Sequence, residues 1–144
     1  MKDSLAPGLT FTHRYCVPEN KTVPALYRES EIMQGMPPVF ATAFMIGLME
    51  WACVELMKPH LEAGEGSVGV HVDVSHSAAT PIGMTVTVDA ELVERDGRRL
   101  KFAVVARDEA EEIGRGIHER FVVHWDRFAG RQAEKVAAWR DGDE

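Results

Sequence analysis

The sequence predicts an α+β fold in which one long central helix is wrapped by an antiparallel sheet of about five strands. Two observations carry this prediction. Residues 40–60 form an apolar segment with apolar side chains on nearly every side of a helix, and about four alternating polar and apolar segments follow it, joined by short turns. A helix of this kind must be covered on most sides, which a curved sheet does. This combination is the hotdog fold.

Each element has its own signal in the sequence. The helix is expected from Phe40 to about His60, where Pro59 and the glycines Gly64 and Gly66 end it. Residues 18–38 contain four prolines and are expected to be irregular, with a helical turn or two at 23–31. The expected strands lie at residues 9–17, 68–76, 84–92, 100–107 and about 113–125, with Asp96-Gly97 as a hairpin turn and a short terminal helix at 127–140.

Composition limits the class of protein. A chain of 144 residues is typical of one domain, here 1–144, and a net charge of −7 argues against nucleic acid or an anionic membrane as the main partner. The longest apolar segment is interrupted by Glu50 and is too short for a bilayer, which needs about 20 residues. The first residues lack the apolar core of a signal peptide. We therefore expect a cytoplasmic protein.

The assembly follows from the predicted architecture. One sheet layer over one helix leaves an edge strand and one helix flank uncovered, so a homodimer is expected. Cys16 and Cys53 and the histidines have no metal-binding spacing, and Cys53 is interpreted as a small core residue. No metal and no cofactor are expected.

Glu50 is the most informative residue of the chain. It is a carboxylate on an apolar helix, and burial of an unpaired carboxylate costs several kcal/mol. His76 continues the alternation of valines on the first strand after the helix, and Thr42 lies near the helix start. Each has a structural alternative: Thr42 caps the helix, Glu50 reaches solvent, and His76 bonds to backbone. Together the three predict a site at the helix–sheet seam, where a carboxylate orients an imidazole that activates a hydroxyl or water.

Two further patterns each allow a structural and a functional interpretation. Residues 64–69 match GxGxxG, but they follow a helix and open a strand, the reverse of a dinucleotide-binding site, so a turn is favoured. Basic residues gather near the hairpin turn, which is usually solvated; with a phosphorylated substrate they are candidate contacts. These residues are Arg95, Arg98, Arg99 and Lys101, with Arg115 or Arg120.

The motifs at these residues resemble the fluoroacetyl-CoA thioesterase family of hotdog enzymes. The matching stretches include Gly47-Leu48-Met49-Glu50-Trp51-Ala52-Cys53, His76 with Ala78-Ala79-Thr80-Pro81, and Gly116-Ile117-His118-Glu119-Arg120, within residues 11–128. The resemblance implies a homodimer that hydrolyses a short-chain acyl-CoA without metal or cofactor. It also implies Thr42, Glu50 and His76 as the catalytic set, with Gly69 and Arg120 near the acyl group.

One departure concerns specificity. In the family's fluoroacetyl-specific enzyme, two phenylalanines three residues apart form a lid before the helix, and here Met33 and Met36 stand at those positions. Methionine is more adaptable, so strict selection of a fluorinated acyl group is not expected.

The individual roles stay open at this point. His76 is a general base or orients the nucleophile, Glu50 polarises His76 or attacks the thioester, and Thr42 is the nucleophile or positions the carbonyl. The alternative functions are a non-catalytic acyl-CoA-binding hotdog module and a hydratase.

Overall fold

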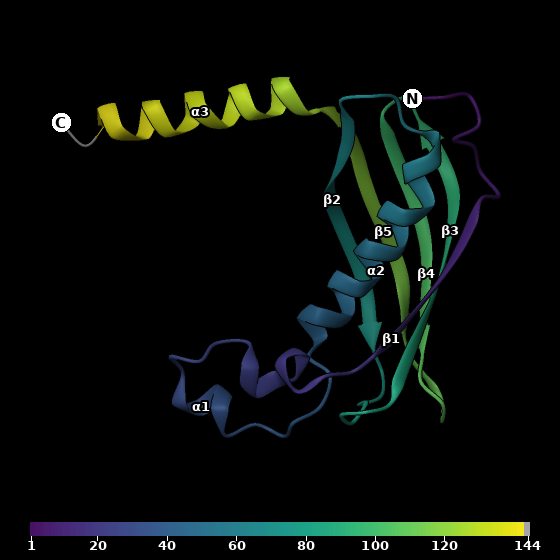
Figure 1. Cartoon of the computed structure of the whole chain (residues 1–144), viewed down its shortest axis with the longest axis vertical. Coiled ribbons are helices and arrows are strands. Elements are labelled where there is room, and N and C mark those ends of the chain that lie inside the picture. The colour runs from purple at the N-terminus through teal and green to yellow at the C-terminus, as the bar shows by residue number, and fades with distance from the viewer. Residues whose placement is uncertain (143–144) are drawn as a thin grey trace.

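The computed structural model describes residues 1–142 and has the predicted helix-on-sheet architecture (Figure 1). Five strands form one antiparallel sheet in the order β1-β3-β4-β5-β2. Helix α2 lies against one face of this sheet. The strands are β1 (Thr10–Cys16), β2 (Glu65–His76), β3 (Thr85–Asp96), β4 (Arg99–Arg107) and β5 (Glu112–His124), and the helices are α1 (Glu31–Gln34), α2 (Thr42–Met57) and α3 (Trp125–Gly142).

Helix α2 is shorter than the sequence predicts. Phe40 does not begin the helix because it forms a β-bridge with Thr22. At the other end, Pro59 lies in a 3₁₀ turn, Lys58–His60, that follows the last α-helical residue. The buried side chains of α2 pack with the inward residues of the sheet into one core, as the predicted hotdog fold requires. They are Met45, Leu48, Met49, Ala52, Cys53, Leu56 and Met57.

The turn between β3 and β4 confirms the predicted hairpin. Asp96 pairs with Arg99, so Gly97 and Arg98 form a two-residue loop. Gly97 has a φ of 58°, a conformation that L side chains rarely adopt, and a glycine in the first loop position matches the right-handed twist of the two strands.

One side of the molecule is left uncovered by this chain. Strand β2 lies at the edge of the sheet, and its Val70 and Val72 are 43% and 41% exposed. On α2, Val54 lies near Gly66 and Ser67 of β2 and is 41% exposed, whereas Trp51, 46% exposed, packs against His13 and Tyr15 on the β1 side of the helix. The expectation that the sheet buries the helix on most sides is therefore wrong for a single chain.

Two arms extend from the two ends of the sheet toward this uncovered side (Figure 1). At one end α3 extends past the edge of β2, and it is longer than the expected terminal helix. At the other end residues 18–39, which include α1, form an irregular arm with two short 3₁₀ turns. None of the helices within residues 1–142 is long and apolar enough to cross a membrane.

Candidate functional site

Thr42 and His76 form a close pair at one end of the sheet. Thr42 is the first residue of α2 and His76 the last residue of β2, and Thr42 Oγ1 lies 2.8 Å from His76 Nδ1. Ala41, not Thr42, occupies the N-cap position of the helix, and no side chain caps it. The alternative that Thr42 serves as a helix cap is therefore wrong, and its hydroxyl is available to the imidazole.

The surroundings of His76 favour a neutral imidazole. Burial lowers the pKa of His76 below its ordinary value, and the nearby backbone of Ala78 opposes this effect. Within the described residues, His76 Nε2 is buried and has no hydrogen-bond partner. A neutral imidazole whose Nδ1 faces a hydroxyl is able to accept the hydroxyl proton.

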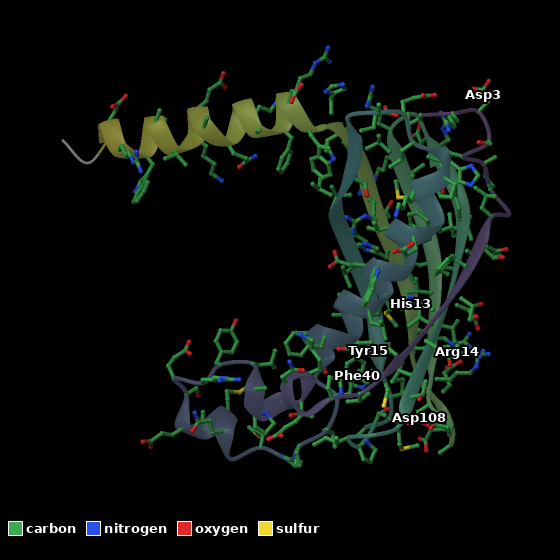
Figure 2. The ribbon with its side chains drawn as sticks, in the orientation of Figure 1. Asp3, His13, Arg14, Tyr15, Phe40 and Asp108 are labelled. Atoms are coloured by element: carbon green, nitrogen blue, oxygen red, sulfur yellow. The ribbon has the colours of Figure 1, made fainter. Side chains whose placement is uncertain are left out.

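A chain of hydrogen bonds links the segments that carry this pair. The backbone amide of Phe40, just before α2, donates to the carbonyl of Thr80 over 2.8 Å. The buried Thr80 hydroxyl donates to Asp108 Oδ2 over 2.8 Å, and Asp108 Oδ1 accepts from the amides of Ala110 and Glu111. Figure 2 labels Phe40 and Asp108 at this end of the molecule. The start of α2, the segment after His76 and the β4–β5 turn are thereby held together.

Glu50 belongs to a second polar cluster, farther along α2. Its Oε1 lies 3.3 Å from Arg120 Nη1 and 3.8 Å from His118 Nε2, and its side chain is 41% exposed. Arg120 is only 7% exposed and also donates to the hydroxyl and carbonyl oxygens of Ser67, at 2.8 and 3.0 Å. The carboxylate therefore has a buried cation as its partner and keeps one side open to solvent.

Gly69 is needed for this second cluster. A Cβ atom at Gly69 would lie 2.7 Å from Glu50 Oε1 and 3.3 Å from His118 Cε1, closer than real Cβ contacts allow for the first of these. The absence of a side chain at Gly69 lets the Glu50 carboxylate approach the β2 backbone. Gly69 thus lies beside the Glu50 carboxylate and the His118 ring.

The expected meeting of Glu50 and His76 does not occur within one chain. Among residues 1–142, the polar contacts of Glu50 are with Arg120 and His118, whereas His76 contacts Thr42. The physical reason is the length of α2: Thr42 and Glu50 are eight residues apart, which is a rise of roughly 12 Å. The chain therefore has two separate polar clusters, one with Thr42 and His76 and one with Glu50, Arg120 and His118.

Sequence reasoning missed His118 and Ser67 as members of the second cluster. His118 is 2% exposed, its Nδ1 lies 2.8 Å from the carbonyl oxygen of His71, and its Nε2 lies 3.1 Å from Arg120 Nη1. Burial and the nearby Arg120 lower the pKa of His118. A signal was present in the sequence: His118 and Arg120 are two residues apart and precede Val122 on the inward face of one strand.

The remaining predicted residues take varied positions. Met33 lies in α1, half-buried, and Met36 is 40% exposed just after this helix. Most basic residues near the hairpin pair with acidic side chains: Arg99 with Glu119, Lys101 with Glu94, Arg115 with Glu112, and Arg98 more distantly with Glu65. Arg95 donates to two backbone carbonyls. No group of three metal-binding side chains occurs in the described part of the chain.

Known proteins of one family are similar to this chain. A family model described as fluoroacetyl-CoA-specific thioesterase matches residues 17–126. The fluoroacetyl-CoA thioesterase of Streptantibioticus cattleyicolor is 53% identical over 138 residues, which cover 96% of this chain and 99% of the relative.

Solved structures show the same similarity. A fluoroacetyl-CoA thioesterase structure superposes with a TM-score of 0.90 at 53% identity, covering 92% of this chain and 98% of the other. A variant of that enzyme in complex with fluoroacetate and CoA gives 0.84 at 55% identity, with coverages of 86% and 99%. A thioesterase superfamily member from Thermus thermophilus gives 0.85 at 27% identity, with coverages of 95% and 97%.

Proposed function

The chain belongs to the fluoroacetyl-CoA-specific thioesterase family and is an acyl-CoA thioester hydrolase, and from this premise we propose how its own residues perform the hydrolysis. The substrate is a short acyl-CoA, in line with the CoA and fluoroacetate bound by a relative. The observation that carries the proposal is the Thr42–His76 pair, with its 2.8 Å separation and its neutral imidazole.

In the proposed first step, Thr42 is the nucleophile and His76 the general base. The Thr42 hydroxyl transfers its proton to His76 Nδ1 as its oxygen attacks the thioester carbonyl. The C–S bond then breaks, His76 returns the proton to the departing CoA sulfur, and an acyl-threonine ester remains. A water molecule hydrolyses this ester and releases the free acid. A purely binding module would not require an imidazole held against a hydroxyl in this way.

In the proposed second step, Glu50 acts as a general base for that water. Its carboxylate is held by Arg120 and is 41% exposed, so it has an open side toward a substrate or water. Because Glu50 and Thr42 of one chain lie far apart along α2, we place the acting Glu50 on a second copy of the chain.

A homodimer through the uncovered side brings the Thr42–His76 cluster of one copy next to the Glu50 cluster of the other. Strand β2 is an open edge with exposed Val70 and Val72. An antiparallel pairing of two β2 edges reverses one copy relative to the other. With the twofold axis near Val72, His76 of one copy lies beside the Gly69 region of the second copy, where Glu50 and Arg120 also lie. Each dimer then has two composite active sites.

The test of the reaction is direct. Purified protein is assayed for CoA release from acetyl-CoA and fluoroacetyl-CoA, together with Thr42→Ala and His76→Ala. We expect turnover by the unmodified protein and a loss of about 10²–10⁴-fold in kcat for each variant. Absence of hydrolysis in this panel and in other short acyl-CoAs, despite binding, would favour the non-catalytic module instead.

A heterodimer tests the composite site. A Thr42→Ala chain and a Glu50→Gln chain, each inactive as a homodimer, are co-expressed with different affinity tags, and the mixed dimer is purified through both tags. Sites built across two copies leave one intact site, so about half of the unmodified activity should return. Sites built within one chain leave none, and the mixed dimer would stay inactive.

A further inference from the structure

Helix α3 leaves the body of the molecule without being covered by it. Of its side chains, Phe128 is half-buried and the others are exposed. Contacts of its first residue, Trp125, nevertheless hold the start of the helix in place. The Trp125 amide donates to the carbonyl of Gly64 over 2.9 Å, and the Trp125 ring lies so close to Gly66 that a Cβ there would be 1.9 Å from it. The helix is therefore anchored at one end and directed past the edge of β2 (Figure 1).

The side chains of α3 are sorted by face. Phe128, Gln132, Val136 and Trp139 recur at intervals of three and four residues and form one stripe, in which Val136 and Trp139 are 41% and 65% exposed. Basic residues flank one side of this stripe, and acidic residues lie on the other side of the helix. The basic flank is Arg127, Arg131 and Lys135, and the acidic residues of the opposite face are Asp126, Glu134 and Asp141. An exposed apolar stripe on an otherwise polar helix is typical of a helix that packs against another surface.

A groove lies at the end of the sheet opposite to α3. It has a volume of about 870 Å³ and combines apolar and polar side chains of the irregular arm with Ile82. Its lining includes Glu19, Pro24, Arg28, Met36, Pro38 and Ile82. In the same arm Tyr27 and Ile32 are 58% and 74% exposed, and Glu29 and Glu31 are also exposed. We call this surface the arm groove.

Helix α3 and the arm groove of one chain cannot meet. They lie at opposite ends of the sheet, separated by the twelve residues of β2, roughly 40 Å of strand. Both nevertheless extend toward the same uncovered side (Figure 1). A second copy rotated by a twofold axis through that side has its ends reversed, so its arm end lies where α3 of the first copy extends.

We propose that α3 of each copy docks into the arm groove of the second copy. This inference rests on the dimer of the proposed function and adds a contact to it. The helix is long enough, because 18 residues span roughly 27 Å. The charges are complementary in part: the groove is lined by Glu19 and Arg28, and the exposed Glu29 and Glu31 follow Arg28 in the arm, so acidic side chains are present for the basic flank of α3. The docked helix also braces the arm that carries Met33 and Met36, so each copy steadies the lid segment of the other.

Chemical crosslinking tests the contact. Ile82→Cys, in the arm groove, is combined with Gln132→Cys, in the middle of the stripe, on a Cys16→Ser background that removes the exposed native thiol. Burial raises the pKa of the Cys53 thiol to about 12, which keeps that residue unreactive. A short bis-maleimide should give a covalent dimer on a denaturing gel. The matched control replaces Gln132→Cys with Glu134→Cys on the opposite face, and each single-cysteine protein is run beside it.

A second measurement does not depend on crosslinking. Val136→Glu places a charge in the stripe, whereas Ala137→Glu places the same charge on the acidic side of the helix. We expect the dimer dissociation constant, measured by light scattering on dilution, to rise about tenfold or more for Val136→Glu and to stay near the unmodified value for Ala137→Glu.

The outcomes separate this inference from the proposed function. Equal crosslinking from positions 132 and 134, or none from position 132 in a proven dimer, would overturn the docking of α3. A monomeric protein would overturn both the docking and the composite active site. A dimer that crosslinks as expected but hydrolyses no acyl-CoA would support the docking and overturn the proposed catalytic roles.

Discussion

The proposed role of His76 as a base rests on its contact with Thr42 and on burial, which favours the neutral imidazole. Its pKa is lowered from an ordinary value of about 6.5, so the imidazole gains a proton only at lower pH. We therefore expect kcat/KM to stay constant as the pH falls through that value and to decline only below it. A pH–rate profile measures this, and a half-maximal rate at or above the ordinary value would contradict the proposed role. Because burial lowers the pKa of His118 as well, the profile of His118→Gln shows which histidine is responsible.

Gly69 affects the site because its lack of a side chain leaves room for the Glu50 carboxylate. In Gly69→Ala, the new methyl group would meet Glu50 Oε1, and the flexible carboxylate would move away from Arg120. We expect kcat/KM to fall by at least tenfold with little change in Tm. Gly130→Ala is the matched control, because a Cβ there meets nothing within 4 Å, and it should stabilise α3 by about 0.5–1 kcal/mol without loss of activity. Equal activity of the two variants would argue against Glu50 in catalysis.

Met33 and Met36 are expected to relax the choice of acyl group. Apolar packing distinguishes groups that differ by one small substituent by only about 1–3 kcal/mol, and methionine adapts its shape more readily than phenylalanine. We expect a weaker preference for fluoroacetyl-CoA over acetyl-CoA than an aromatic lid would give, and a stronger one in Met33→Phe/Met36→Phe. The measurement is kcat/KM for both thioesters. A large fluoroacetyl preference that the double substitution leaves unchanged would show that these residues do not set specificity.

At the scale of elements, Asp108 connects the β4–β5 turn, through Thr80, to the segment just before α2. Burial opposes its ionisation, but hydrogen bonds from Ala110, Thr80 and Glu111 outweigh this and lower the pKa of Asp108. Its contribution to stability is therefore present above about pH 3.8 and is lost as the pH falls through the lowered value.

Removal of this carboxylate should weaken the connection between the elements. Asp108→Ala leaves the buried Thr80 hydroxyl without its acceptor, and we expect a loss of about 1–3 kcal/mol in the free energy of unfolding, measured in urea at neutral pH. The loss relative to the unmodified protein should shrink at low pH. Thr80→Ala/Asp108→Ala is the control, and a cost no larger than that of Asp108→Ala alone would confirm that the two residues act as a pair. A pH-independent cost would contradict the role of the ionised carboxylate.

At the scale of the whole molecule, the uncovered side predicts association. Val70, Val72 and Val54 together leave an apolar surface beside an open strand edge. Light scattering at micromolar concentration should report about twice the 16.0 kDa mass of the chain. Val72→Lys, a charge in the middle of the edge strand, should shift the protein toward a monomer and reduce hydrolysis in parallel, whereas Arg14→Ala on the opposite edge strand should do neither. A fully active monomer would contradict the composite site.

The sequence alone was sufficient for the architecture and for the family. The apolar segment around α2, the alternation in the strands and the Asp96-Gly97 turn depend on local periodicity and backbone preference, which neighbouring residues determine. Glu50 was conspicuous because a carboxylate on an apolar helix requires a partner or a function, and the motifs around it indicated the family. These inferences do not depend on which distant residues come into contact.

Only the tertiary structure decided how those residues are grouped. In the structure Thr42 pairs with His76, whereas Glu50 pairs with Arg120 and His118. The groupings differ because Thr42 lies at the start of α2 and Glu50 in its middle, where β5 places inward-facing side chains. The tertiary structure also showed that β2 is an edge and that α3 and the residue 18–39 arm extend to the same side. Contacts between residues dozens of positions apart depend on strand order and register, which local sequence patterns do not specify.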